Sequence, residues 1–136
     1  MIRPIVHDPL FLAQKSVPAE EADRQIITDL LDTLRAHLDC CVGMAANMIG
    51  ERKRIIVFCN GPMLVVMINP QITASSGPYE TEEGCLSLAG VRKTNRFHKI
   101  TVTYQNQLFQ PRTGTFEGFT AQVIQHEIDH CDGRLI

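Results

Sequence analysis

The chain has 136 residues, of which 44% are hydrophobic and 21% charged, and its formal net charge is −2 at pH 7. This length predicts one domain, spanning residues 1–136, that can bury a core of its own. The nearly balanced charge excludes the strongly basic surface that binds a phosphate backbone, so we expect no direct nucleic-acid partner.

The N-terminal third of the sequence predicts a cytoplasmic protein that begins with an amphipathic helix. The first segment, MIRPIVHDPLFLAQ, places His7 and Asp8 where a secretory signal needs apolar residues. Further along, Glu20 and Glu21 precede apolar residues that recur every three or four positions, which is typical of a helix with one apolar face. We expect this helix to run from about residue 19 to 39 and to pack on a sheet.

The middle of the sequence predicts a loop followed by a β-hairpin. Residues 42–51, VGMAANMIGE, are small and flanked by glycine, which suits a loop that approaches a ligand. Residues 54–60 and 63–70 are rich in β-branched side chains on either side of a turn at residues 60–62. The turn also interrupts the longest apolar stretch, which then lacks the roughly 20 residues of a membrane span. We therefore expect no membrane partner.

The second half of the sequence predicts further strands and a C-terminal helix. Residues 75–87 resemble a loop with a short strand, and residues 91–97 and 98–106 continue as strands. A helical pattern runs from residue 115 or 116 to about 132, and Gly133 stands where a helix stop is expected. The whole pattern predicts an α+β fold with small mixed or antiparallel sheets packed around the C-terminal helix.

The cysteines argue against a disulfide framework, because the chain has five of them and no recognisable export signal. An isolated cysteine is most often a small buried apolar side chain, and we expect this of Cys40, Cys41 and Cys59. Cys131 should point about 100° away from its neighbour His130 around a helix, so we expect it to pack in the core.

The segment QHEIDH, residues 125–130, carries the strongest chemical signal. On a helix, His126 and His130 project from the same face and can reach one metal ion. Glu127 lies to the side, where it can reach a water molecule near the metal without being a ligand. Two histidines alone are more often a surface or core pair, but the added glutamate favours a metal-dependent hydrolase.

A third metal ligand must come from upstream, because the six residues after His130 include neither histidine nor glutamate. Zinc endopeptidases take this ligand from downstream, which makes them a weak alternative here. Cys85, directly after Gly84, offers a thiol. One cysteine and two histidines leave a tetrahedral ion an open position, the arrangement of a catalytic site.

The chain resembles the peptide deformylases in three signatures, in order and spacing along essentially its whole length. The Glu-Gly-Cys-apolar-Ser signature is intact at residues 83–87, and the His-Glu-apolar-Asp-His signature is intact at 126–130. The Gly-x-Gly-apolar-Ala-Ala-x-Gln signature is partial at 41–48, where Cys41 replaces the first glycine and Met48 the glutamine.

The resemblance implies removal of the N-terminal formyl group from formyl-methionyl nascent polypeptides by a monomeric enzyme. Cys85, His126 and His130 would bind one divalent ion, with Fe²⁺ implied and Zn²⁺, Ni²⁺ or Co²⁺ as alternatives. Glu127 would be the general base and acid, and the backbone N–H of Leu86 would hold the oxyanion. The residues implied in substrate binding are Val42, Gly43, Met48, Gly84 and Arg92.

The methionine at position 48 leaves two hypotheses open. A thioether donates no hydrogen bond, so the chain could be a deformylase of reduced activity or a metal-containing peptide-binding module without turnover. The intact Glu127 favours the enzyme, because a binder needs no general base. Asn47 could replace the missing amide if the loop bulged by one residue. Asp129 is expected to support the site or lie on the helix surface.

Overall fold

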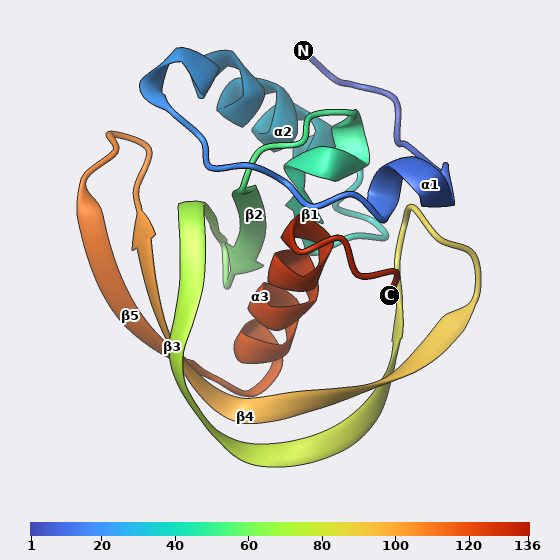
Figure 1. Ribbon diagram of the computed structural model, residues 1–136, viewed down its shortest axis with the longest axis vertical. Coiled ribbons are helices and arrows are strands. Elements are labelled where there is room, and N and C mark those ends of the chain that lie inside the picture. Colours follow the sequence, from blue (N-terminus) through green and yellow to red (C-terminus); the bar gives the residue numbers. More distant parts are fainter.

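The computed structural model describes all 136 residues. The chain forms one antiparallel sheet with helices on both of its faces (Figure 1). The helices are α1 (Pro9–Leu12), α2 (Arg24–Ala36) and α3 (Gly118–Cys131). The strands, in sheet order, are β1 (Gly43–Ala45), β2 (Ile55–Asn60), β3 (Met63–Gly84), β4 (Val91–Gln105) and β5 (Pro111–Glu117). The predicted α+β class is confirmed, with a single five-stranded sheet in place of several small ones.

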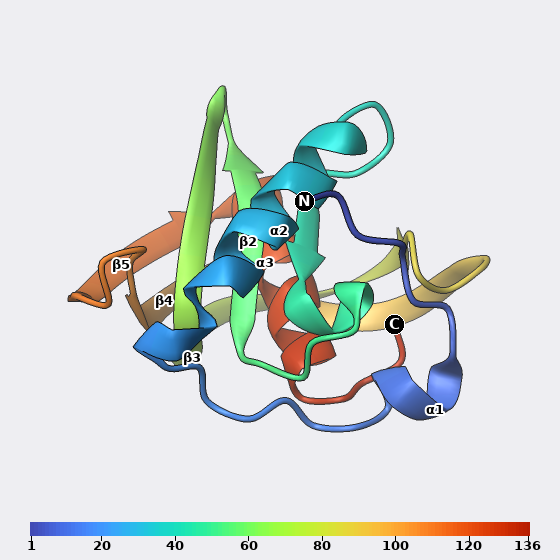
Figure 2. The ribbon, with the colours of Figure 1, turned by 90° about the horizontal axis from the view of Figure 1, so that it is seen from above.

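Strand β2 lies at the centre of the core and is buried on both faces. Its side chains alternate: Ile55 and Val57 pack in the cluster that contains α2, whereas Ile56 and Phe58 pack in the cluster that contains α3. This alternation follows from the two-residue period of a strand. Helix α2 therefore covers one face of β1 and β2 (Figure 2), and α3 covers the other.

Helix α2 is shorter than the predicted range of 19–39. A 3-10 turn, Glu21–Asp23, precedes it, because the Glu20 N–H donates to the Asp23 carboxylate at 2.8 Å and fixes a tight first turn. Its buried residues include Leu30 and Leu34, which agree with the predicted apolar face. None of the helices has the combination of length and apolar character that crossing a lipid bilayer requires.

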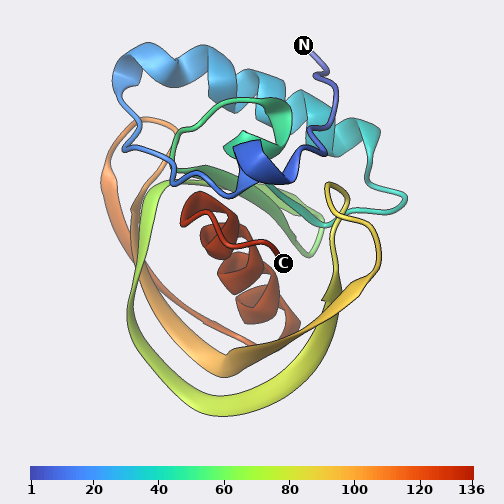
Figure 3. The same ribbon diagram turned by 45° about the vertical axis from the view of Figure 1, so that its right-hand side comes forward.

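The prediction of a loop with only a short strand at residues 75–87 is wrong up to Gly84, because β3 runs without interruption to that residue, and only residues 85–87 lie outside the strand. It pairs with β4 from Ile68 to Gly84 with two register shifts, and the resulting two-stranded ribbon curves around α3 (Figure 3). Irregularities of this kind bend and twist a strand pair. The polar, exposed residues of the ribbon hid the strand from a search for hydrophobic alternation.

Three other segments differ from the expectations. Residues 42–51 are not wholly a loop, since they form β1 and a 3-10 turn, Ala46–Ile49, that ends at Gly50 with φ of 90°. Strand β5 and the short helix α1 were not predicted. Helix α3 begins at Gly118, slightly later than expected. In the folded chain, β1, the end of β3 and the helix α3 converge on one region.

Candidate active site

Three donor atoms from two distant parts of the chain meet beside α3. His126 and His130 lie one helical turn apart, and their Nε2 atoms are 3.2 Å apart. Cys85 directly follows β3, and its Sγ lies 3.2 Å from His130 Nε2. All three donor atoms lie within 4.8 Å of one another. The structure therefore brings together the thiol and the two imidazoles that the sequence singled out.

The spacing of these atoms fits one four-coordinate ion. Bonds of about 2.1 Å to nitrogen and 2.3 Å to sulfur, at tetrahedral angles, separate two nitrogens by about 3.4 Å and a nitrogen from a sulfur by about 3.6 Å. The observed separations of 3.2 Å need only small adjustments. One thiol and two imidazoles suit zinc or ferrous iron, whereas magnesium and calcium prefer oxygen. Three protein ligands leave a fourth position open.

The protein environment shifts the pKa values of His126 and His130 in opposite directions. Burial and the nearby charge of His126 lower the pKa of His130 to about 3, so His130 stays neutral. At His126, burial opposes the charged form, but hydrogen bonds to Cys85 and Glu83 outweigh it and raise the pKa to about 10. Since a metal ligand must give up its proton, ion binding here is coupled to proton release.

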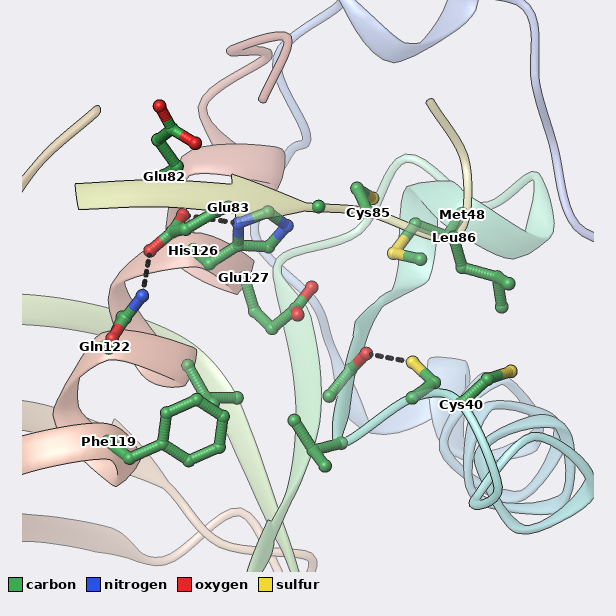
Figure 4. A pocket seen from close by; sticks show the side chains of 15 residues that line it. Cys40, Met48, Glu82, Glu83, Cys85, Leu86, Phe119, Gln122, His126 and Glu127 are labelled. Atoms are coloured by element: carbon green, nitrogen blue, oxygen red, sulfur yellow. Dashed lines mark hydrogen bonds and ion pairs between the residues drawn. The ribbon is translucent and has the colours of Figure 1, made fainter. Parts of the chain in front are cut away.

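Glu83 organises the site from the end of β3. Its Oε1 lies 2.8 Å from His126 Nδ1, and both of its oxygens accept from the Arg96 guanidinium at 2.7 and 2.9 Å. Gln122 Nε2 donates to Glu83 Oε2 at 2.9 Å (Figure 4). Although burial opposes ionisation, these hydrogen bonds lower the pKa of Glu83 to about 2. The carboxylate therefore accepts from His126 Nδ1–H and leaves Nε2 free for an ion.

Arg96 is the buried cation that joins this network to α3. Only 3% of its surface is exposed, and its Nη1 donates to Asp129 Oδ2 at 2.7 Å while its other nitrogens hold Glu83. Asp129 thus supports the arrangement and lies away from the donor cluster. Neither the supporting role of Glu83 nor Arg96 was predicted from the sequence, because the partners of both residues are distant along the chain.

Replacing Arg96 by alanine should weaken both the fold and the metal site. The substitution leaves Glu83 and Asp129 without their shared cation, so we expect a loss of about 3 to 5 kcal/mol in unfolding free energy. Metal affinity should fall about 10- to 100-fold, because His126 loses its fixed orientation. Chemical denaturation and competition with a chelator measure the two effects.

The matched control is Lys99→Ala, which removes an exposed cation from the same strand. It should leave stability and metal affinity close to those of the unmodified chain. Unchanged metal affinity in folded Arg96→Ala protein would show that this network does not orient the ligands.

A cavity of about 520 Å³ opens beside the donor cluster (Figure 4). It lies between β1, the end of β3 and the first turns of α3. The residues that line it are Cys40, Cys41, Val42, Gly43, Met48, Glu82, Glu83, Gly84, Cys85, Leu86, Phe119, Gln122, Val123, His126 and Glu127. The mixture of apolar walls with a few converging polar groups is typical of a substrate pocket.

Glu127 is buried at this cavity and available for proton transfer. Only 4% of its surface is exposed, its Oε1 has no hydrogen-bond partner, and burial raises its pKa to about 7. Gly43 packs directly against it: a Cβ at position 43 would lie 2.9 Å from Glu127 Oε2 and 2.7 Å from Val123 Cγ1. Position 43 therefore requires glycine to leave room for the carboxylate.

Met48 and Asn47 both lie in the 3-10 turn after β1, but their side chains make different contacts. Met48 is buried, lines the cavity, and accepts the Ala45 N–H on its Sδ at 3.4 Å. Asn47 turns the other way: its Nδ2 donates to the His130 carbonyl at 2.9 Å, and it does not line the cavity. This geometry does not support the suggestion that Asn47 replaces the missing amide. Asn47 instead ties the turn to the end of α3.

The other residues considered for substrate contact divide into two groups. Val42, Gly84 and Leu86 line the cavity, whereas Arg92 is exposed on β4 and lies outside the lining. The backbone N–H of Leu86 donates to no acceptor within the chain. It is therefore free to donate to a ligand.

The cysteines correct one expectation and bear out another. Cys40 is exposed at the cavity, so it is not the core residue that the sequence suggested. Cys41 also lines the cavity, but it is half-buried and packs against the core cluster that contains α2. Cys59 is half-buried on β2. Cys131 packs in the core, where burial raises its pKa to about 12.

One thiol and two imidazoles that could hold an ion, with a buried carboxyl group lining the same cavity, are typical of a metal-dependent hydrolase. The sequence model of the polypeptide deformylase family matches residues 2–136 of the chain. A peptide deformylase of Clostridium beijerinckii is 57% identical over 136 residues, which covers 100% of both chains. Peptide deformylase 2 of Clostridium acetobutylicum is 40% identical over 128 residues, 91% of this chain and 85% of that protein. The chain belongs to the peptide deformylase family.

Solved structures support the same assignment. A peptide deformylase from Legionella pneumophila has a TM-score of 0.89 and 36% identity, covering 99% of this chain and 83% of that one. The Met-Ala-Ser-bound peptide deformylase from Acinetobacter baumannii has a TM-score of 0.89 and 27% identity, covering 99% and 97%. The family, the fold and the enzyme hypothesis are confirmed over the alternative of a binding module without turnover.

Proposed function

We propose that this chain removes the formyl group from the N-terminus of formyl-methionyl peptides, giving formate and a free amine. The observation that carries the proposal is the convergence of Cys85, His126 and His130 beside the unpartnered carboxyl oxygen of Glu127. A cavity adjoins this cluster and can admit a peptide end. The natural substrates are then nascent chains, and the cytoplasm is the compartment where the enzyme meets them.

The proposed cofactor is one divalent ion held by Cys85, His126 and His130. When bound by these residues, an ion would supply Lewis acidity, which would acidify a water molecule and polarise the formyl oxygen. We propose Fe²⁺ in the cell, with Zn²⁺, Ni²⁺ or Co²⁺ able to occupy the same ligands, because a mixed nitrogen and sulfur site does not by itself select among these metals.

Glu127 is the proposed general base and then general acid. Its buried carboxyl group has a pKa raised to about 7, close to the value that suits proton transfer near neutral pH. It would take a proton from the attacking water and return it to the departing amine nitrogen. Gly43 leaves the space that the Glu127 carboxyl group occupies.

Oxyanion stabilisation rests on fewer donors than the first signature of the family provides. The free N–H of Leu86 is the proposed donor from the chain. Met48 stands at the cavity in the position of the signature glutamine and can donate nothing. Turnover should therefore be measurable but slow.

Peptide contacts are proposed for Val42, Gly43, Met48 and Gly84, which line the cavity. Arg92 is exposed nearby and could meet only the outer part of a peptide, so we assign it a peripheral contact. We propose that residues 1–136 act as one monomeric domain without a nucleic-acid or membrane partner.

Formate release from formyl-Met-Ala-Ser by protein loaded anaerobically with Fe²⁺ tests the proposed function. The loaded protein should release formate in multiple turnovers, and removal of the metal with a chelator should abolish the release. Formate at the level of the metal-free sample, from protein shown to contain one bound ion, would overturn the proposal.

A further inference from the structure

Strand β1 is an edge strand, and half of its backbone groups face away from its neighbour. It begins the sheet order and pairs only with β2, in antiparallel register. The Cys59 N–H donates to the Val42 carbonyl at 2.9 Å. Because antiparallel strands alternate between bonded and non-bonded pairs, Gly43 and Ala45 direct their N–H and C=O groups away from β2.

Two sulfur atoms engage these outward-facing groups. Cys41 Sγ donates to the Gly43 carbonyl at 2.9 Å, and the Ala45 N–H donates to Met48 Sδ at 3.4 Å. Cys41 and Met48 are the two positions at which the first signature departs from the family pattern. The free edge of β1 is therefore capped by Cys41 and Met48, the two side chains that depart from the family signature.

The capped edge lies where an extended peptide would bind. A free strand edge is a ready acceptor for an added peptide strand, and Gly43 and Cys41 both line the cavity. The unpartnered, buried Oε1 of Glu127 in the same cavity is a second sign that a ligand enters it. A peptide that pairs with β1 must share the Gly43 carbonyl with the Cys41 thiol or displace that thiol.

We propose that Cys41 is a specificity-determining residue whose thiol competes with the substrate backbone for the Gly43 carbonyl. The proposal rests on the deformylase function given above. The thiol is a weak donor, so a peptide N–H can displace it, but the displacement removes part of the gain from pairing. The enzyme then gains less from the peptide residue that pairs with Gly43 than an enzyme with glycine at position 41 would gain.

Steady-state kinetics with formyl-Met-Ala and formyl-Met-Ala-Ser tests this role. Cys41→Ala removes the cap and should lower KM for the longer peptide about 3- to 10-fold, the range of one net hydrogen bond. KM for the shorter peptide and kcat for both should change less. Cys41→Ser keeps a hydroxyl donor and should keep the KM of the unmodified enzyme or raise it.

The control is Cys59→Ala, which removes a half-buried thiol on β2 outside the cavity and should leave the peptide-length dependence unchanged. Equal KM values for Cys41→Ala, Cys41→Ser and the unmodified enzyme with formyl-Met-Ala-Ser would overturn the role of Cys41. If the unmodified enzyme released no formate, the proposed function would fail instead.

A spectroscopic measurement on the metal-loaded protein tests the competition without relying on kinetics. The S–H stretching band of Cys41, assigned by subtraction of Cys41→Ala, should show a hydrogen-bonded thiol and shift toward a free thiol when Met-Ala-Ser binds. A band that does not move on saturation with this peptide would contradict the competition. This result does not depend on catalytic turnover.

Discussion

Replacing Glu127 by glutamine should lower the rate of formate release about 100- to 10,000-fold, the usual contribution of a positioned general base. Glutamine preserves the shape of the side chain but cannot accept a proton. The buried position of Glu127 at the cavity and its pKa of about 7 support its proposed role in proton transfer. The bound metal should remain, because Glu127 is not one of the three converging donors.

Two measurements separate a loss of chemistry in Glu127→Gln from other causes. Metal content by elemental analysis should be the same for Glu127→Gln and the unmodified enzyme, which separates loss of chemistry from loss of the ion. Glu117→Gln, an exposed carboxylate that precedes α3, is the matched substitution and should retain full turnover. If Glu127→Gln retained full activity with a full complement of metal, another group would have to transfer the proton.

Replacing Met48 by glutamine should raise the rate of formate release, by up to about 100-fold. One oxyanion donor is typically worth about 100- to 1,000-fold in rate, and Met48 lines the cavity at the signature position of such a donor. Glutamine can accept the Ala45 N–H on its oxygen, as Met48 Sδ does, and direct its amide nitrogen into the cavity. The change should appear mainly in kcat.

Met48→Leu is the comparison that isolates the amide. Leucine fills a similar volume and donates no hydrogen bond, so turnover should not rise. An equal rate for Met48→Gln and Met48→Leu would mean that the glutamine side chain does not reach the oxyanion, or that other groups already stabilise it fully.

The sequence predicted those parts of the fold that have a strong local pattern. The hairpin around residues 60–62 followed from its β-branched flanks and its turn, and Asn60 pairs with Met63 as expected. The long ribbon of β3 and β4 was underestimated, because its residues are mostly polar and it is held by cross-strand pairing and by its course around α3. Such support comes from distant residues and leaves no periodic signal.

The candidate site likewise has some residues that the sequence predicted and others that it did not. The convergence of Cys85, His126 and His130 was predictable, because a metal site requires particular residue types and two histidines four residues apart share one face of a helix. The Glu83 and Arg96 pair was not, since β3, β4 and α3 must come together before that contact exists. The direction of the Asn47 side chain was likewise set by a carbonyl 83 residues away.

X-ray absorption at the metal edge of the loaded protein tests the central claim most directly, because it reports the atoms bound to the ion. We predict one sulfur at about 2.3 Å, two imidazole nitrogens near 2.1 Å and one further light atom. Cys85→Ser should remove the sulfur contribution. A shell of oxygen and nitrogen alone in the unmodified protein would contradict the assignment of Cys85, His126 and His130 to one ion.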